Sequence, residues 1–196
     1  MHTLLFATGN PNKIREVNEM LSDSWNVRSI LDMGIEEELP ENQDTLEGNA
    51  LEKARYIYEK TGLDCFSEDT GLEIDALGGA PGVYTARYGG DAKDPQANIR
   101  KVLRELQGTT NRKARFRTVI ALILGGEEYL FEGIAPGEIR QEPSGSGGFG
   151  YDPVFKPEGY SITFAEMDPA TKNQISHRGQ AVRKLVAFLK DHVDNQ

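Results

Sequence analysis

A short apolar run that ends in a turn and leads into an amphipathic segment narrows the possible folds more than any other feature. Residues Leu4 to Thr8 predict a buried strand, which Gly9-Asn10-Pro11 ends. Asn12 to Leu21 then predicts a helix with its apolar side chains on one face. A strand, a tight turn and a helix in this order are typical of the opening of an α/β domain.

Three later segments also predict helices. One begins near Asp44, which can cap it, and ends at Gly62. The next begins at Asp94-Pro95, which supply a cap and a proline at the first helical position. The last runs from about residue 174, or a few residues later, to residue 192.

Strands are predicted between these helices. Residues 63–66 indicate a strand that runs into Ser67-Glu68-Asp69-Thr70-Gly71, and residues 72–76 alternate as in a half-buried strand. Residues 115–124 and 129–135 predict a β-hairpin. Because βα units favour parallel pairs and a hairpin is antiparallel, the sheet is expected to be mixed.

Composition favours a packed protein with an acidic surface. The 196 residues, 38% apolar and 27% charged, suffice for one domain over residues 1–196. The net charge of -9 disfavours binding to nucleic acid or to an anionic membrane. A polyanionic substrate would therefore need a bound divalent cation and a local group of Lys and Arg.

The cysteine content and the apolar runs predict where the protein works. Cys65 is the single cysteine, so the chain forms no internal disulfide and a reducing compartment fits. The apolar run from Leu4 to Ala7 is too short for a signal peptide, and no stretch approaches the length of a membrane span. We expect the cytoplasm.

The first candidate for chemistry is Thr8-Gly9-Asn10-Pro11-Asn12-Lys13, where the first strand meets the first helix. Backbone N–H groups and the dipole of a helix N-terminus favour phosphate there, and Lys13 adds a positive charge. The segment lacks the second glycine and the Lys-Ser/Thr pair of a Walker motif. An ordinary turn with a surface lysine is the alternative.

Carboxylates form the second candidate. Glu68 and Asp69 follow a strand, where carboxylates can hold Mg²⁺, and one of them can accept a proton from an attacking water. Glu41 is a further acid just before a helix. The alternatives are a turn in which Asp69 caps backbone groups, and a solvated loop acid at Glu41.

Ser146 to Asp152 form the third candidate. Glycines flank Phe149 and leave room for a flat base to stack on its ring. Asp152 can then accept a hydrogen bond from a base N–H. The alternative is a loop with Phe149 tucked into the core.

The fourth candidate is the basic segment from Lys172 to Gly179. Lys and Arg are disfavoured near a helix start, so their presence suggests an anionic or carbonyl-bearing ligand. His177 and Arg178 together offer donors to carbonyl oxygens. A zinc site of three histidines is excluded, because His2 is terminal and His192 lies in the last turn.

In this order, these segments resemble the inosine triphosphate pyrophosphatase (ITPase) family of nucleotide hydrolases. The resemblance runs from Leu4 to about Leu189. Each segment is weak alone, whereas the ordered set is specific. The matching stretches are Thr8 to Lys13, Ser67 to Leu72, Gly78 to Tyr88, Phe149 to Phe155 and Ser176 to Arg178.

The resemblance implies an α/β fold with an elongated mixed β-sheet flanked by helices, in two lobes with a central cleft. It implies a homodimer that uses Mg²⁺ to cleave ITP, dITP and XTP between the α and β phosphates. By motif match, Asp69 is the general base and shares the metal with Glu41. The residues implied to bind substrate are Thr8, Gly9, Asn10, Pro11, Asn12, Lys13, Lys53 and Arg87 on the phosphate side, Thr70 beside Asp69, and Phe149, Gly150, Tyr151, Asp152, Lys172, His177 and Arg178 at the base.

Two departures from the family pattern bear on the metal. Family members often have Glu-Asn-Ala where this chain has Gly48-Asn49-Ala50, which removes one acid. Ser67-Glu68 stands in place of a small residue and Asp, which keeps the charge.

The implied reaction has two rivals. In the reaction itself, a water activated by Asp69 and Mg²⁺ attacks the α-phosphorus, and donors from His177 and Arg178 prefer the C6 carbonyl of inosine and xanthosine to the amino group of adenosine. A Maf-like pyrophosphatase for modified pyrimidine triphosphates is one rival, and the His-Arg pair argues against it. A non-catalytic nucleotide-binding regulator is the other rival. The set of Lys13, Glu41 and Asp69 argues against it, because binding alone needs no general base.

Overall fold

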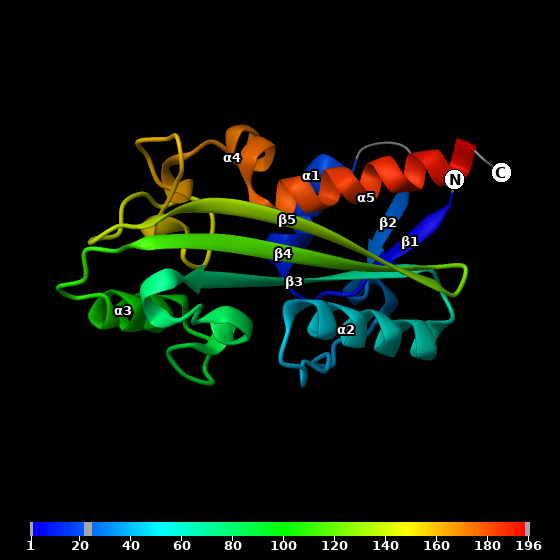
Figure 1. Ribbon diagram of the computed structural model, residues 1–196. Helices are drawn as coiled ribbons and strands as arrows, with labels where there is room; N and C mark the ends of the chain where they lie inside the picture. The colour runs from blue at the N-terminus through cyan, green and yellow to red at the C-terminus, as the bar shows by residue number, and fades with distance from the viewer. Residues whose placement is uncertain (1, 22–24, 195–196) are drawn as a thin grey trace. The chain divides into compact units, whose positions relative to one another are not determined.

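The structure is a computed structural model that describes residues 2–21 and 25–194. Its strands form one sheet in the order β2-β1-β3-β4-β5-β6. Strand β1 pairs in parallel with β2 and β3, and β5 pairs antiparallel with β6 (Figure 1), so the prediction of a mixed sheet is confirmed. The strands are β1 (Thr3–Phe6), β2 (Asn26–Ser29), β3 (Cys65–Ile74), β4 (Lys113–Leu124), β5 (Glu127–Ile139) and β6 (Phe155–Pro157).

Helices flank these strands, as the sequence predicted. The α-helices are α1 (Pro11–Met20), α2 (Leu46–Thr61), α3 (Pro95–Glu105), α4 (Pro169–Ile175) and α5 (His177–Asp194). Short 3-10 helices complete the described chain: η1 (Leu31–Met33), η2 (Asp75–Leu77), η3 (Gly82–Arg87), η4 (Asp152–Val154) and η5 (Phe164–Glu166). Among residues 2–21 and 25–194, no helix has the length and apolar content needed to cross a membrane.

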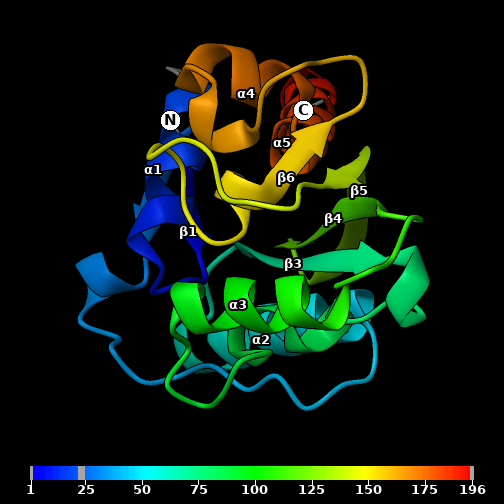
Figure 2. The same ribbon diagram turned by 90° about the vertical axis from the view of Figure 1, so that its left-hand side faces the viewer.

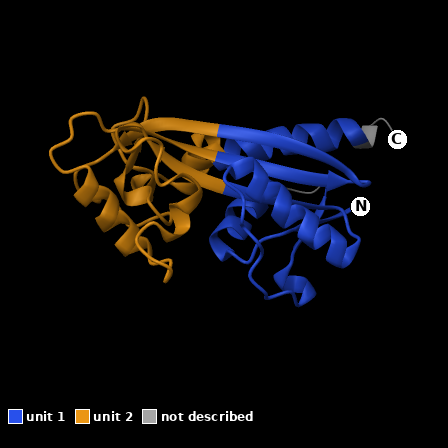
Figure 3. Cartoon of the chain, turned by 60° about the horizontal axis from the view of Figure 1, so that its bottom comes forward, with its two compact units in different colours: residues 1–69, 118–133, 178–196 blue, residues 70–117, 134–177 orange. Residues whose placement is uncertain are grey.

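The chain divides into two compact units, which Figure 3 shows in different colours. Unit 1 comprises residues 1–69, 118–133 and 178–196, and unit 2 comprises residues 70–117 and 134–177. Strands β3, β4 and β5 contribute residues to both units. The two units correspond to the two lobes that the resemblance implies, whereas the central cleft stays a prediction.

Each unit has its own apolar core. In unit 1, α1 and α5 lie on one side of the strands and α2 on the other (Figure 1). In unit 2, α3 lies on one side of the strands and α4 on the other (Figure 2). The core of unit 1 contains Leu4, Phe6, Val17, Phe66, Ile120, Leu122, Ala181, Val182, Leu185 and Leu189, and that of unit 2 contains Leu72, Ile74, Ile99, Val102, Phe116, Tyr151, Phe155 and Phe164.

Strand β3 departs from the predicted pattern. The sequence predicted a strand over residues 63–66 with the carboxylates at its end, and alternation over residues 72–76, but one strand runs without a break from Cys65 to Ile74. The carboxylates are buried inside it, with Glu68 only 2% and Asp69 only 8% exposed. The predicted strand end was wrong because ion pairs, rather than water, satisfy these acids.

The predicted last helix is confirmed as α5, which begins at His177, within a few residues of the predicted start. The sequence analysis did not predict α4, which precedes it; Asp168 caps α4, and its carboxylate accepts a hydrogen bond from the N–H of Thr171 at 3.0 Å. Pro169 follows in the first turn. This is the same start signal as at Asp94-Pro95, where the predicted helix start is confirmed.

The remaining predictions concern turns and caps. Strands β4 and β5 are neighbours joined by Gly125-Gly126, both with positive φ as a tight hairpin turn requires, so the hairpin is confirmed. Gly62 ends α2 in the left-handed conformation, as predicted. The predicted cap at Asp44 was wrong by one residue, because the Thr45 hydroxyl accepts the hydrogen bond from the N–H of Gly48 at 3.0 Å.

Candidate active site

The turn between β1 and α1 is ordered by its own side chains. Asn10 caps α1, and its side-chain oxygen accepts hydrogen bonds from the N–H groups of Asn12 at 2.9 Å and Lys13 at 3.4 Å. The N–H of Asn10 donates to the Thr8 hydroxyl at 3.1 Å. Space is open where a Cβ on Gly9 would stand. A phosphate could therefore approach the backbone at Gly9, while Asn10 already satisfies two N–H groups of the first turn.

A buried network of four charges lies behind this turn in unit 1. Glu68 accepts hydrogen bonds from Arg178 Nε at 2.8 Å and Nη2 at 3.2 Å, and lies 2.8 Å from Lys13 Nζ. Arg178 Nη1 also contacts Glu16. Burial disfavours a charge on Glu68, but Arg178 and Lys13 outweigh it and hold the pKa of Glu68 well below its usual range.

This network differs from what the sequence indicated for Arg178. Its guanidinium is 2% exposed and engages two carboxylates, so its implied contact with a base stays a prediction. Glu16, 5% exposed, was missed by the sequence analysis. The signal that could have found it is an acid one helical turn after Lys13 on the buried side of α1, next to Val17.

A second group of charges in unit 1 surrounds Lys53 on α2. Lys53 Nζ donates to Glu41 Oε1 and to the carbonyl of Glu68, both at 2.7 Å, and lies 3.6 Å from Asp69 Oδ1. Burial raises the pKa of Asp69, although Lys53 and Lys13 oppose that shift. Burial works against the charge of Lys53, yet Asp69 and Glu41 prevail and raise its pKa. The structure thus brings together Lys13, Glu41, Lys53 and Asp69, which were predicted from separate segments.

The predicted base-binding residues of unit 2 gather around Lys172. Its Nζ donates to Asp152 Oδ2 at 2.7 Å and lies 5.0 Å from the ring centre of Phe149. The same carboxylate oxygen accepts the N–H of Phe149 at 3.0 Å. Gly148 permits this arrangement, because a Cβ there would stand 2.1 Å from Asp152 Oδ2. Lys172 and Asp152 are each 4% exposed, so they fix the loop that carries Phe149.

The aromatic residues of this loop have opposite environments. Phe149 is half-buried, so the alternative that placed it in the core is not what the structure has. Tyr151, which follows Gly150, is 4% exposed and packs in the core of unit 2. The His177 ring is 4% exposed and stacks on Phe116 with ring centres 4.6 Å apart. Their implied contacts with a base stay predictions.

The helix-dipole argument for the basic segment was wrong for Lys172. Because α4 ends at Ile175, Lys172 lies in its last turn, where a cation suits the dipole. Arg178 does lie at the start of α5, but Glu16 and Glu68 meet its charge. Because α4 ends before α5 begins, Lys172 is not a cation at a helix start, and the argument for an anionic ligand from its position no longer holds.

Two further implied substrate contacts lie in unit 2. Thr70 is half-buried in β3. Arg87 is exposed at the end of η3, with its guanidinium carbon 5.8 Å from the ring centre of Tyr84. An exposed guanidinium is compatible with binding a phosphate.

Comparisons with known proteins decide the family. A model described as the Ham1 family matches residues 4–188. The chain belongs to the Ham1 family. The dITP/XTP pyrophosphatase of Flavobacterium johnsoniae is 50% identical over 186 residues, which cover 95% of this chain and 97% of the relative. That of Porphyromonas gingivalis is 50% identical over 190 residues, with 96% and 98% covered.

Solved structures of Ham1 proteins have the same fold. The Ham1 protein from Coxiella burnetii is 36% identical with a TM-score of 0.90, and the match covers 97% of this chain and all of that one, 100%. A nucleoside-triphosphatase, dITP/XTP pyrophosphatase, from Mycobacterium abscessus is 40% identical with a TM-score of 0.76, covering 95% and 98%. The α/β mixed-sheet fold and the resemblance read from the motifs are both confirmed.

The acids of this Ham1 chain fit a divalent metal ion. Asp69 Oδ2 is buried and has no hydrogen-bond partner among the described residues. Those residues contain no group of three or more His, Cys, Asp and Glu side chains placed to hold a metal without a substrate. Mg²⁺ commonly takes one or two carboxylates and completes its shell with water and phosphate oxygens, which Glu41 and Asp69 would allow.

The residue at position 48 explains why this chain has one acid fewer than the family pattern. A Cβ on Gly48 would stand 2.7 Å from Gln43 Cβ and 3.0 Å from the Thr45 hydroxyl. A glutamate there would require the segment before α2 to move. The close packing of Gln43 and Thr45 against α2 therefore accounts for the glycine at position 48.

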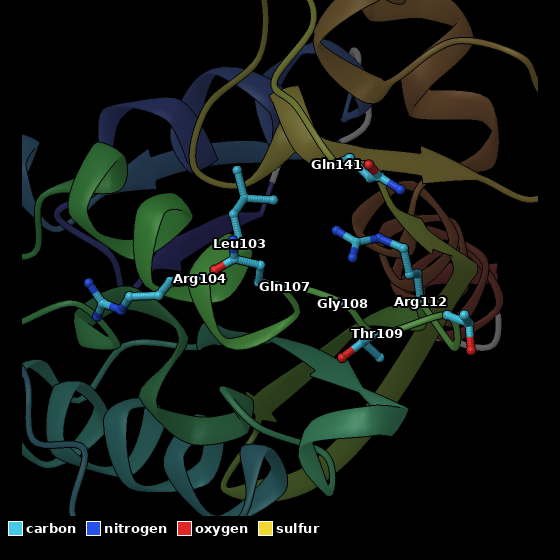
Figure 4. Close-up of a pocket in the computed structure, with 8 residues that line it drawn as sticks. Leu103, Arg104, Gln107, Gly108, Thr109, Arg112 and Gln141 are labelled. Carbon is cyan, nitrogen blue, oxygen red and sulfur yellow. The ribbon is translucent and has the colours of Figure 1, made fainter.

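One surface hollow in unit 2 lies at the C-terminal end of α3. It measures about 780 Å³ and is lined by Leu103, Arg104, Gln107, Gly108, Thr109, Thr110, Arg112 and Gln141 (Figure 4). The Arg112 guanidinium donates to the carbonyls of Leu106, Ile139 and Arg140 at 2.7 to 3.0 Å. Arg112 therefore ties loops together there and none of the predicted site residues lines the hollow.

Proposed function

We propose that this protein hydrolyses the deaminated purine nucleoside triphosphates ITP, dITP and XTP to the monophosphate and pyrophosphate. The protein is a nucleoside triphosphate pyrophosphatase, a hydrolase that cleanses the nucleotide pool. The observation that carries the proposal is the cluster of Lys13, Glu41, Lys53 and Asp69, in which Asp69 Oδ2 has no hydrogen-bond partner in the described chain. Relatives that are 50% identical and named dITP/XTP pyrophosphatase support it.

The reaction divides among residues of this cluster. Asp69 accepts a proton from the attacking water, whose oxygen bonds to the α-phosphorus as the bond from that phosphorus to the bridging oxygen breaks. Lys13, the Thr8 to Lys13 turn and the exposed Arg87 offset negative charge on the triphosphate. Glu41 and Asp69 would hold Mg²⁺, which would supply positive charge against the phosphate oxygens and would lower the pKa of a bound water. Lys53 keeps the two acids close together.

Base recognition is assigned to unit 2 and to Arg178. The half-buried Phe149 ring is the surface on which a purine stacks, since the Lys172–Asp152 pair holds the loop beneath it. His177 and Arg178 supply the preference for a C6 carbonyl over an amino group, which a site built on hydrogen bonds can enforce strongly. In this assignment the Tyr151 ring stays in the core of unit 2, and Gly150 adopts a positive φ in the loop between Phe149 and Tyr151.

Neither rival function is favoured. A Maf-like enzyme for modified pyrimidine triphosphates would not account for relatives that bear the name dITP/XTP pyrophosphatase. A nucleotide-binding regulator would not need a buried acid beside two lysines, because binding alone requires no general base.

Pyrophosphate release over a panel of triphosphates tests the proposal. The purified protein with Mg²⁺ is offered ITP, dITP, XTP, ATP, GTP and a modified pyrimidine triphosphate, and the nucleotide product is identified. We expect the monophosphate and pyrophosphate from the deaminated purines, at a kcat/KM at least about 100-fold above that for ATP. Preference for the pyrimidine would favour the Maf-like function, and binding without turnover would favour the regulator.

The assembly and location follow the same proposal. We propose a homodimer, with residues 1–196 acting as one catalytic domain because β3, β4 and β5 are shared by both units. We propose a cytoplasmic location, where Cys65 stays reduced. Burial raises the pKa of the Cys65 thiol to about 12, so the thiol stays protonated. Light scattering on the purified protein distinguishes a dimer from a monomer.

A further inference from the structure

The segment that carries Arg87 is anchored to Asn98 of α3. The Asn98 side chain is 4% exposed, accepts the N–H of Gly89 at 2.6 Å and donates to the carbonyl of Ala86 at 3.0 Å. A Cβ on Gly89 would stand 2.6 Å from the backbone of Ala97, so the segment approaches the helix as closely as a glycine allows. Asn98 therefore holds the chain on both sides of Arg87.

On the N-terminal side of Arg87, Tyr151 supplies a further anchor from the loop assigned to the base. The hydroxyl of Tyr151 donates to the carbonyl of Thr85 at 2.6 Å. The Tyr151 ring is held in the core of unit 2, and burial raises the pKa of its hydroxyl, which stays protonated as a donor. Asn98 of α3 and Tyr151 therefore both hold the backbone that carries Arg87.

Tyr151 also adjoins the groups that hold Phe149. Asp152, the next residue, accepts the N–H of Phe149 and pairs with Lys172. Two neighbouring residues therefore act on both parts of the site. Asp152 holds the loop that carries the Phe149 ring, and the Tyr151 hydroxyl binds the backbone of Thr85, two residues before Arg87.

We propose that the hydroxyl of Tyr151 is a positioning group for Arg87. Through this hydroxyl, the loop that binds the base is coupled to the binding of the triphosphate. This inference rests on the proposed function. Its distinctive consequence is that the hydroxyl acts on catalysis only through Arg87. Removal of the hydroxyl should loosen triphosphate binding without removing any contact to the base.

A double-mutant cycle with Tyr151→Phe and Arg87→Ala tests this dependence, with kcat and KM for ITP measured in Mg²⁺. We expect Tyr151→Phe to lower kcat/KM about five-fold, the effect of one neutral hydrogen bond, mainly by raising KM. Arg87→Ala should lower kcat/KM more, and the double variant should match Arg87→Ala alone. Tyr160→Phe, which removes a hydroxyl from an exposed ring of the same unit, should match the unchanged protein.

Several outcomes would overturn the inference. They are effects that multiply in the double variant, no change in KM for Tyr151→Phe, no effect of Arg87→Ala, or a Tyr151→Phe protein that does not fold by circular dichroism. Failure of the proposed function is distinguishable, because the unchanged protein would then release no pyrophosphate from ITP.

Discussion

Adjacent carboxylates on β3 have opposite environments, and this contrast supports our proposal that Asp69 is the base. Successive side chains of a strand point to opposite faces, so Glu68 meets Arg178 and Lys13 while Asp69 meets Lys53. The pKa of Glu68 is lowered and that of Asp69 is raised. Neighbouring acids whose pKa values are pushed apart have different roles, and the acid with the raised pKa suits proton transfer.

Asp69→Asn should abolish turnover and leave the fold intact. The amide keeps the volume of the side chain but cannot take a proton from water, so kcat for ITP should fall at least about 100-fold. Initial rates of pyrophosphate release measure this, with circular dichroism as the test of folding. Asp75→Asn, an exposed acid in η2, is the matched control and should keep normal rates. A kcat for Asp69→Asn within a few-fold of the control would remove Asp69 as the base.

Glu68→Gln should change how stability depends on pH. Glu68 has a folded pKa far below its unfolded value of about 4.5, so its contribution is complete above about pH 4.5 and is lost as the pH falls. The variant leaves Arg178 and Lys13 with one carboxylate fewer and should lose about 3 kcal/mol of unfolding free energy at pH 7.

Urea unfolding at several pH values between 7 and about 3 measures the difference between the two proteins. We expect the difference to be constant down to about pH 5 and to shrink below it. Glu158→Gln, an exposed acid, should remain close to the unchanged protein. A gap that widened in acid would contradict the ion-pair network.

At the scale of elements, local signals in the sequence predicted starts and turns better than extents. The proline after a capping Asp marks the start of α3, and the glycine pair marks the hairpin. The strand through Glu68 to Gly71 was not predictable in this way, because its acids are buried only by partners from distant elements. Arg178 and Glu16 are separated by 162 positions, so no local pattern in the sequence pairs them.

In the candidate site, too, the sequence predicted residues from local segments but not their packing partners. The residue types at Lys13, Glu41 and Asp69 were predicted from their own segments, and the structure brings them around Lys53. The partners that hold these residues were not predicted, since they follow from packing. Tyr151 is an example: its segment suggested a base contact, whereas its ring is in the core and its hydroxyl reaches Thr85.

Gly148→Ala should weaken base selection. The added Cβ would collide with Asp152 Oδ2, so the carboxylate would leave Lys172 and the N–H of Phe149. We expect the ratio of kcat/KM for ITP to that for ATP to fall by about ten-fold, since one buried charged hydrogen bond is lost. Gly159→Ala shares the positive φ but meets open space, and it should keep the ratio. Equal ratios in both variants would exclude the Lys172–Asp152 pair from selection.

At the scale of the molecule, charge sets the requirement for a cation. The chain carries a net charge of -9, and the lysines of the candidate site already pair with Glu41, Glu68 and Asp69. A triphosphate must therefore approach carboxylates as well as ammonium groups, and like charges repel it. A divalent cation that binds both the acids and the phosphates turns this repulsion into attraction.

Removal of the metal should therefore stop the reaction, and Glu41 should set how much metal is needed. With a chelator, pyrophosphate release from ITP should fall to background, and added Mg²⁺ should restore it. Glu41→Gln should raise the Mg²⁺ concentration for half-maximal rate at least about ten-fold, because one of two carboxylate ligands is lost. Glu37→Gln changes an exposed acid in the loop before α2 and should leave that concentration unchanged. Full turnover in chelator, or the same Mg²⁺ requirement in both variants, would mean that Glu41 binds no metal and that its pairing with Lys53 serves the fold alone.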